Sequence, residues 1–308
     1  MRDRLAAASL ARLEFPDNDT FHDDACFVLE NLAALTRRSD QIKRLRDTIL
    51  MLAVRGRLVS QNPKDEVLTG SLIQRSKPRK VDDAEVTLKV NAAESASNRG
   101  QIPISWRWMT TDNLCESIVD CPHSTPVFVP NGVICLDTNS IKNGKLISYK
   151  VRYVSEATYF ERVKRLVPRA GDVVFAREGS VGDSFIIPEG MRCCLGQRVM
   201  LFRPTTAVLP RYFSLALSEP SSLLRLLDLH KGIGAKHVNV SDMRKALIPL
   251  PPLAEQHRIV TKVDELMVFC DRLEASLSTA ARTRRRLLDA LLAEALAPAE
   301  DRKLEAAE

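Results

Sequence analysis

The sequence lacks a long hydrophobic run and any CxxC or zinc-type spacing of cysteines. No apolar stretch approaches the about 18 residues that span a bilayer, and the N-terminal MRDRLAAASLARLEF lacks the uninterrupted apolar core of a signal peptide. The seven cysteines are scattered, with no CxxC and no His/Cys spacing of the zinc type. We therefore expect a cytoplasmic protein with reduced thiols, no membrane span and no bound metal.

The sequence also lacks the motifs of common enzyme classes. It contains no GxxxxGK[ST] phosphate loop, no glycine-rich cofactor fingerprint after a strand, no HExxH and no GxSxG. Asp172 and Glu178 flank a predicted strand, but no lysine stands two residues beyond the glutamate to complete a nuclease cluster. We expect neither catalysis nor a cofactor in this chain.

The net charge of +6 is concentrated in one part of the chain. Between residues 101 and 250 there are 19 Lys and Arg against 13 Asp and Glu, so this segment carries the whole excess. It also holds 12 of the 16 aromatic residues, which indicates that it is both the folded core and the basic face. A basic domain attracts polyanions by its field and by counterion release, although a solvated positive surface is the simpler interpretation of charge alone.

The N-terminal region, residues 1–58, is predicted to be helical. Apolar residues between 22 and 55 fall near one heptad stripe, with Ser39 as an internal cap or break, and Gly56 ends the helix in the usual C-terminal manner. From residue 59 to residue 101 the composition is polar and without period, which favours a linker.

Residues 102–252 change character and are predicted to be mostly β. The stretch LISYKVRYV alternates apolar and polar residues, the period-two pattern of a half-buried strand. Further short strands are predicted at GVICLD, GDVVFA, SFIIPE and RVMLFRP, with two short helices at about 211–217 and 220–230. Trp106 and Trp108 are expected to fill the core at the first strand of this domain.

A long helix is predicted over residues 253–297, after the proline-rich IPLPPLAEQHRIV and before a short tail at 298–308. Its apolar seam steps by alternating intervals of 4 and 3, the mark of a coiled coil: Ile259, Val263, Leu266, Cys270, Leu273, Leu277 and Ala280. Such a helix would be about 65 Å long, more than a compact domain needs for its own core. It must pack on a second chain, or on residues 22–55 in an intramolecular hairpin. The expected fold class is α+β: a β-rich domain flanked by an N-terminal helical region and a long C-terminal coiled-coil helix.

Four stretches together resemble the DNA-specificity subunit of Type I restriction-modification systems. They are LRDTILMLAVRGRLVSQNPKDE (45–66), ISWRWMTTDNLCESIVDCPHSTP (104–126), GDVVFAREGSVGD (171–183) and HVNVSDMRKALIPLPPLAEQHRIVTKVDELMVFCDRLEASL (237–277). The last stretch carries most of the resemblance, because the prolines, the Glu255-Gln256 pair and the heptads follow in the family's order.

The resemblance implies a target-recognition domain that reads one part of a split DNA site, and a helix that acts as spacer and docks methyltransferase subunits. Usual members hold two recognition domains in one chain, whereas this sequence has one. We therefore expect a homodimer, or pairing with another half-subunit, through the C-terminal helix at Ile259, Val263, Leu266, Cys270, Leu273 and Leu277. The expected partners are double-stranded DNA and methyltransferase subunits that bind S-adenosylmethionine, with a restriction subunit as a further candidate, in a role in phage defence.

On this hypothesis, lysines and arginines contact phosphates, and loop residues with paired donors and acceptors contact bases. The predicted phosphate contacts are Lys142, Lys145, Lys150, Arg152, Arg162, Lys164, Arg165 and Arg169. The predicted base-reading loops contain His123, Ser124, Thr125, Asn139, Ser140, Arg177, Glu178, Ser180, Lys231, Lys236, His237 and Asn239. Simpler interpretations stay open, since Asn139 can cap a turn and His123 can be a solvated loop residue.

Two other classes of protein compete with this hypothesis. The first is a non-catalytic scaffold, a β-rich domain on a coiled coil whose basic charge is incidental. The second is an enzyme that uses the thiol of Cys121 with His123, or the Cys193-Cys194 pair.

Overall fold

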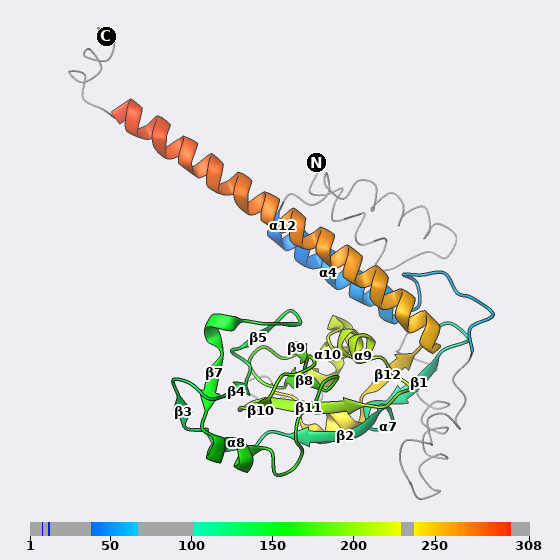
Figure 1. Ribbon diagram of the computed structural model, residues 1–308. Coiled ribbons are helices and arrows are strands. Elements are labelled where there is room, and N and C mark those ends of the chain that lie inside the picture. The colour runs from blue at the N-terminus through cyan, green and yellow to red at the C-terminus, as the bar shows by residue number, and fades with distance from the viewer. Residues whose placement is uncertain (1–7, 9–11, 13–37, 67–101, 229–236, 297–308) are drawn as a thin grey trace, which may run out of the picture. The chain divides into compact units, whose positions relative to one another are not determined.

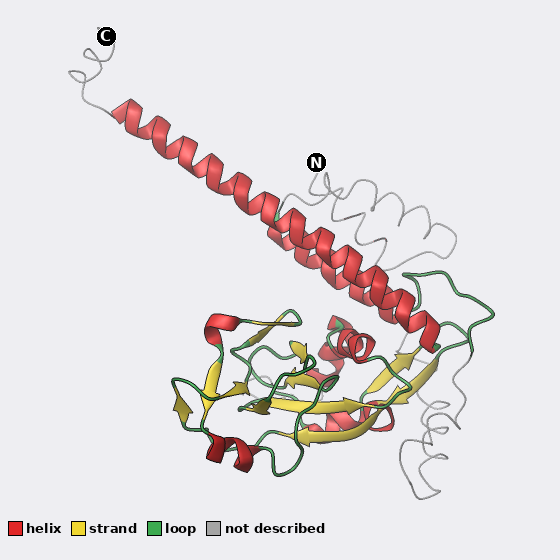
Figure 2. Cartoon of the chain, in the orientation of Figure 1, coloured by secondary structure: helices red, strands yellow, loops and turns green. Residues whose placement is uncertain are grey.

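The computed structural model describes residues 8, 12, 38–66, 102–228 and 237–296. These fall into two compact units, one formed by residues 1–48 and 264–308 and the other by residues 49–263. All of the described strands belong to the larger unit, and the described part of the smaller unit is helical (Figure 2).

The larger unit combines short strands with short helices, and its two long helices continue into the smaller unit (Figure 1). In chain order the described elements are α4 (Ser39–Val54), β1 (Arg107–Thr110), α7 (Thr111–Leu114), β2 (Cys115–Asp120), β3 (Phe128–Val129), β4 (Val133–Leu136), β5 (Ile141–Lys142), β6 (Lys145–Leu146), the 3-10 helix η1 (Ser148–Lys150), β7 (Arg152–Val154), α8 (Glu156–Arg162), β8 (Val173–Ala176), β9 (Ser184–Ile186), β10 (Cys193–Leu195), β11 (Val199–Pro204), α9 (Pro210–Leu217), α10 (Pro220–Asp228), α11 (Val240–Lys245), β12 (Leu247–Leu250) and α12 (Leu253–Leu296).

The described strands form two four-stranded sheets and two two-stranded ribbons. The sheets have the strand orders β2-β11-β8-β9 and β10-β4-β7-β3, and the ribbons pair β1 with β12 and β5 with β6. Pairing is antiparallel except between β10 and β4. The central strands β8 and β11 are continuous apolar runs, VVFA and VMLF, because both of their faces are buried.

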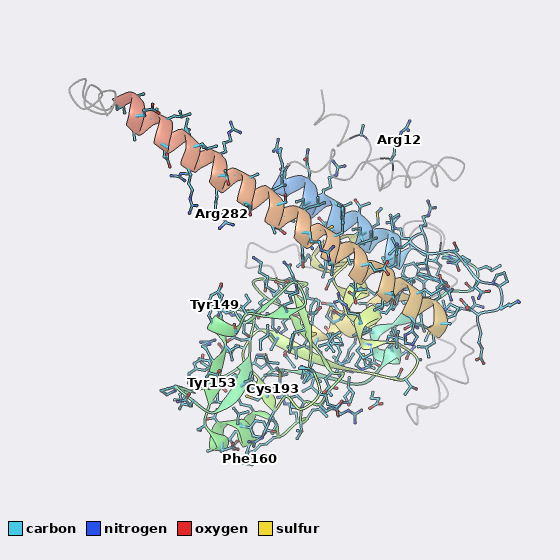
Figure 3. All side chains as sticks on the ribbon, turned by 45° about the horizontal axis from the view of Figure 1, so that its top comes forward. Arg12, Tyr149, Tyr153, Phe160, Cys193 and Arg282 are labelled. Atoms are coloured by element: carbon cyan, nitrogen blue, oxygen red, sulfur yellow. The ribbon has the colours of Figure 1, made fainter. Side chains whose placement is uncertain are left out.

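Two clusters of buried residues in the larger unit meet at strand β10. Cys193 packs into a cluster that includes Val174, Phe185 and Leu201, whereas its neighbour Cys194 packs into a second cluster with Tyr159 of α8. Successive side chains of a strand point to opposite faces, so β10 separates the two clusters. Figure 3 places Cys193 inside the β-rich unit.

The start of α12 is fixed to the larger unit by buried polar contacts. Glu255 accepts hydrogen bonds from the indole N–H of Trp106 at 3.0 Å and from the side-chain amide of Gln61 at 2.6 Å. Gln256 donates to the carbonyl of Ala207 at 3.1 Å and accepts from the backbone N–H of Leu209 at 2.8 Å. The prolines before α12 hold the chain extended until this Glu-Gln pair locks the first helical turn.

In the smaller unit α4 lies beside α12 (Figures 1 and 3). The guanidinium of Arg46 contacts Asp271 at 2.7 Å and Glu274 at 3.1 Å, and Cys270 of α12 is fully buried. This is the intramolecular hairpin that the sequence left open.

Part of the interface that was predicted for a second chain is therefore already buried by contacts within this chain. Ile259, Val263 and Cys270 are 0% exposed, so these three side chains are not available to a partner, while Leu266, Leu273 and Leu277 are half-buried. Exposed apolar side chains also occur on α12 at Leu253, Val268 and Phe269. Further along the helix, exposed leucines recur at Leu287, Leu288, Leu291, Leu292 and Leu296.

The expected α+β fold class is confirmed, and most predicted strands lie where the sequence placed them. Trp106 is buried and packs edge-to-face on Tyr212 at 6.4 Å between ring centroids. Gly56 ends α4 with a φ of +69°, and Arg57 donates its backbone N–H to the carbonyl of Leu52, as in a Schellman motif. The N-terminal part of the predicted helix and most of the predicted linker lie outside the described residues.

The prediction of one strand over LISYKVRYV was wrong. The stretch ends β6, forms η1 over Ser148–Lys150 and only then enters β7. The backbone N–H of Ile147 donates to the carbonyl of Ser140, which closes the β5-β6 hairpin, and the chain must then turn to reach β4. Tyr149 is consequently 84% exposed instead of sharing a buried face.

None of the described helices combines the length and the apolar character that a membrane span requires.

Candidate nucleic-acid interface

The loops that follow strands β2, β8 and β10 are joined to one another. We call them the loop cluster, residues 121–125, 177–183 and 196–198. The backbone N–H of Arg177 donates to the carbonyl of Arg198 at 2.9 Å, and the side-chain amide of Gln197 donates to the carbonyl of His123 at 3.1 Å. Three segments that are separate in the sequence therefore form one surface.

Arg162, at the end of α8, holds two of these loops from behind. Its guanidinium donates to the carbonyls of Leu195 at 2.6 Å and Gly196 at 2.9 Å, and to those of Ser124 at 3.1 Å and Pro122 at 3.4 Å. The residue is 8% exposed. The predicted phosphate contact at Arg162 is thus not supported, because its donors are used to fix the loop cluster.

A set of neighbouring ion pairs connects side chains of the loop cluster. Arg177 Nε lies 3.1 Å from Asp120 Oδ1, and Glu178 contacts both Arg177, at 3.7 Å, and Arg198, at 3.4 Å. His123 Nε2 lies 3.4 Å from the other oxygen of Asp120. The side chain of Arg177 is 9% exposed, whereas those of Arg198 and His123 are 62% and 72% exposed. The predicted base reader Arg177 therefore belongs to the interior of the site.

The predicted loop at Asn139 and Ser140 is a turn built around Asp137. Asp137 accepts from the backbone N–H of Asn139 at 2.9 Å and pairs with Arg152, and the hydroxyl of Ser140 donates to its carbonyl at 2.9 Å. Ser140 is fully buried, so it stabilises this turn, while Asn139 is exposed. The hydroxyl of Ser180, in the loop cluster, donates to the carbonyl of Thr138 in this turn at 3.5 Å.

A basic hairpin lies next to the loop cluster. We use this name for residues 141–150, which comprise β5, β6 and η1. Asn143 and Gly144 form its two-residue turn at φ of +50° and +77°, and the backbone N–H of Asn143 donates to Asp183 at 3.0 Å. Lys142 and Lys145 are cross-strand partners and are exposed. Like charges directly opposite each other destabilise a ribbon, and a bound polyanion would remove this penalty.

Two further aromatic and basic side chains extend the hairpin. Tyr149 and Lys150 are exposed on η1, with the ammonium of Lys150 5.9 Å from the centroid of the Tyr149 ring. Lys164 and Arg165 are also exposed, but they follow α8. Figure 3 shows Tyr149 and Phe160 of α8 apart from each other, so the predicted phosphate contacts divide between two areas of the domain.

The remaining predicted readers lie at the edges of the loop cluster. Ser124 and Thr125 are exposed, and His237 forms a β-bridge with Glu178. Asn239 stands at the N-terminal cap of α11. Lys231 and Lys236 lie outside the described residues, whereas the predicted contact Arg169 is paired with Glu116 at 2.9 Å.

The thiols of Cys121 and Cys193 are placed unfavourably for nucleophilic chemistry. Burial raises the pKa of the Cys121 thiol, and burial raises the pKa of Cys193 to about 12, whereas a reactive cysteine requires a lowered pKa. A hydrogen bond with Cys135 lowers the pKa of the Cys194 thiol, but Cys194 is fully buried and out of reach of a substrate. Among the residues that the structure describes, no group of three or more His, Cys, Asp or Glu could hold a metal ion.

Arg198 is the site residue that sequence reasoning missed. It stands between β10 and β11 with a φ of +63°, and its carboxylate partner Glu178 comes from a distant part of the sequence. No motif marks it, since its neighbours form a plain GQRVM stretch.

Residues 131–280 match the family model described as the Type I restriction modification DNA specificity domain. The chain is similar to Type I restriction enzyme specificity subunits.

Curated relatives extend the similarity beyond that domain. The chain is 23% identical over 273 residues to the Type I restriction enzyme EcoAI specificity subunit of Escherichia coli, covering 86% of this chain and 46% of the relative. It is 25% identical over 300 residues to the EcoEI specificity subunit of the same species, covering 87% of this chain and 49% of the relative. The chain thus spans about half the length of the curated relatives it matches.

A solved structure shares the fold. A chain from work on the complex assembly and conformational transition of the type I R-M system matches with a TM-score of 0.50 and 22% identity. The match covers 73% of this chain and 56% of that chain.

Proposed function

We propose that this chain reads duplex DNA through the loop cluster and the basic hairpin, as the specificity subunit of a Type I restriction-modification complex. Methyltransferase subunits, with S-adenosylmethionine, and restriction subunits would carry out the chemistry. The observation that carries the proposal is the joining of three loops that together present His123, Ser124, Thr125 and Arg198.

The charges support a division of work within this surface. Exposed lysines of the basic hairpin suit phosphates, which position a protein without reading sequence. The loop cluster instead presents mixed donors and acceptors, including the carboxylate of Glu178, and such groups distinguish base edges in the major groove. A surface that only attracted polyanions would have no use for acidic side chains at its centre.

A gel shift tests this proposal. The purified chain is titrated into random-sequence duplex at low salt, alone and with its methyltransferase partner, and the duplex is expected to be retarded in both cases. The control is Lys43→Ala, a change of one exposed lysine on α4. A chain that joins the methyltransferase but leaves the duplex unretarded would instead be the non-catalytic scaffold.

We further propose that a second copy of this chain packs on the exposed end of α12. Leu287, Leu288, Leu291, Leu292 and Leu296 are between 49% and 81% exposed and recur at helical spacing. Exposed leucine stripes of this kind mark contact surfaces, and two copies would present two recognition domains to a split DNA site.

A further inference from the structure

Arg198 occupies a fixed place at the centre of the loop cluster. Its carbonyl accepts the backbone N–H of Arg177, and the side chain of its neighbour Gln197 is bonded to the loop that contains His123. The residues on either side, from Cys193 to Gly196 and from Val199 to Phe202, are fully buried. Arg198 therefore displays a 62% exposed side chain on an immobile backbone.

The backbone conformation of Arg198 is unfavourable for its residue type. A φ of +63° lies in the left-handed region, which a long side chain rarely adopts outside constrained sites. Gly196 stands only two residues before it, and a Cβ there would lie 2.7 Å from Asp137 Cβ, so this turn is tightly packed. Glycine would adopt this backbone conformation at a lower energetic cost than arginine. Strained residues of this kind cluster at functional sites, so the arginine indicates a functional role at this position.

The position of Glu178 beside the guanidinium of Arg198 favours contact with a DNA base over contact with a phosphate. The carboxylate of Glu178 lies 3.4 Å from Nε of Arg198. Its closest contact with the guanidinium is therefore at Nε and not at either of the two terminal Nη atoms. Arginine reads guanine by two parallel hydrogen bonds to O6 and N7. A carboxylate at this distance repels phosphate, whereas it can accept a hydrogen bond from N4 of the cytosine paired with that guanine. The pair Arg198 and Glu178 thus matches a G·C base pair better than it matches the DNA backbone.

We propose that Arg198 is a specificity-determining residue that reads the guanine of one G·C pair in the target, with Glu178 accepting from N4 of the paired cytosine. This inference rests on the proposed function, because it assigns a role within the same DNA-reading surface. It replaces the sequence-based assignment of that role to Arg177, whose guanidinium is buried against Asp120.

Selection from a randomised duplex library, followed by sequencing of the bound fraction, tests the inference. The full-length chain with its methyltransferase partner is compared with Arg198→Ala and Arg198→Gly. The glycine variant removes the unfavourable backbone conformation, and urea denaturation of both variants separates a loss of preference from a failure to fold. Arg192→Ala is the matched control, because Arg192 is a half-exposed arginine that also pairs with a carboxylate, Glu156 at 2.6 Å.

The wild type and the control are expected to enrich one sequence that includes a G·C pair. Both Arg198 variants should lose the preference at that single pair by about tenfold to a hundredfold and keep it elsewhere. Unchanged enrichment in the Arg198 variants, or uniform weakening at all sequences, overturns the inference and leaves the proposed function standing. If the wild type itself enriches no sequence, the proposed function fails and the inference fails with it.

Discussion

The backbone N–H of Arg177 donates to the carbonyl of Arg198 at 2.9 Å, yet the two side chains have opposite environments. Arg177 is 9% exposed and faces Asp120, whereas Arg198 is 62% exposed and faces solvent beside Glu178. Two arginines of one loop cluster therefore differ in role: the first stabilises the loops, and the second is available to a ligand.

Replacing Arg177 by Ala should destabilise the protein. The change leaves the carboxylate of Asp120, 17% exposed, with only the imidazole of His123 beside it, and removing one partner of a largely buried polar pair costs about 1–3 kcal/mol. Urea denaturation should show this loss in the free energy of unfolding. Arg198→Ala removes an exposed pair and should cost less than about 1 kcal/mol. Equal losses in the two variants would show that Arg177 is not the structural arginine.

Replacing Arg198 by Gly should stabilise the chain while weakening its DNA preference. A left-handed conformation costs about 1 kcal/mol or more for a residue with a Cβ, and glycine adopts it freely. We expect a gain of about 0.5–1 kcal/mol in the free energy of unfolding, after the greater entropy of glycine in the unfolded chain is subtracted. A loss of stability in urea denaturation would mean that the arginine side chain contributes to folding.

The sequence predicted more of the fold than of the site. The prolines and Glu255-Gln256 place the start of α12, and the apolar runs of β8 and β11 mark central strands, because these signals are local. Arg162 and Arg177 read as surface charges in the sequence, since the carbonyls and the carboxylate that hold them come from other segments. The role of Arg198 depends on a backbone angle and a distant partner, and neither is written in a local pattern.

Glu255, in the first turn of α12, should make the free energy of unfolding depend on pH. Burial raises the pKa of Glu255, although hydrogen bonds from Trp106 and Gln61 oppose the shift. The folded state therefore binds the proton more tightly than the unfolded state, whose pKa is about 4.3. This contribution is full below that value and is lost as pH rises through the raised folded pKa.

The difference in unfolding free energy between wild type and Glu255→Gln isolates this effect. It should favour the wild type more at pH 4 than at pH 8, because only the wild type loses the contribution. The control Glu189→Gln makes the same substitution at an exposed glutamate. A pH-independent difference for Glu255→Gln would contradict the assignment.

The exposed leucines of α12 should govern the mass of the protein in solution. The double variant Leu288→Asp with Leu291→Asp places charges in the proposed contact and should shift a dimer to a monomer in light scattering. Ile104→Asp is the control, because Ile104 is 96% exposed on the larger unit and should leave the mass unchanged. A wild type that is monomeric at all concentrations would rule out the second copy as the partner.

Neutralising the basic hairpin should weaken binding to all duplexes alike. Each lost phosphate contact reduces the steepness of log K against log[salt] by about 0.9. The combined change of Lys142, Lys145 and Lys150 to Ala should therefore make the slope shallower by about 2.7 and leave the preferred sequence the same. A changed sequence preference would show that the hairpin reads bases.

The salt dependence of duplex binding by the wild-type chain, with its methyltransferase partner, tests the central claim most directly. Contacts from Lys142, Lys145 and Lys150 of the basic hairpin would neutralise about three phosphates, so log K against log[salt] should fall with a slope of about −2.7 or steeper. A slope near zero, with equal affinity for every duplex, would contradict a DNA-reading role for this chain.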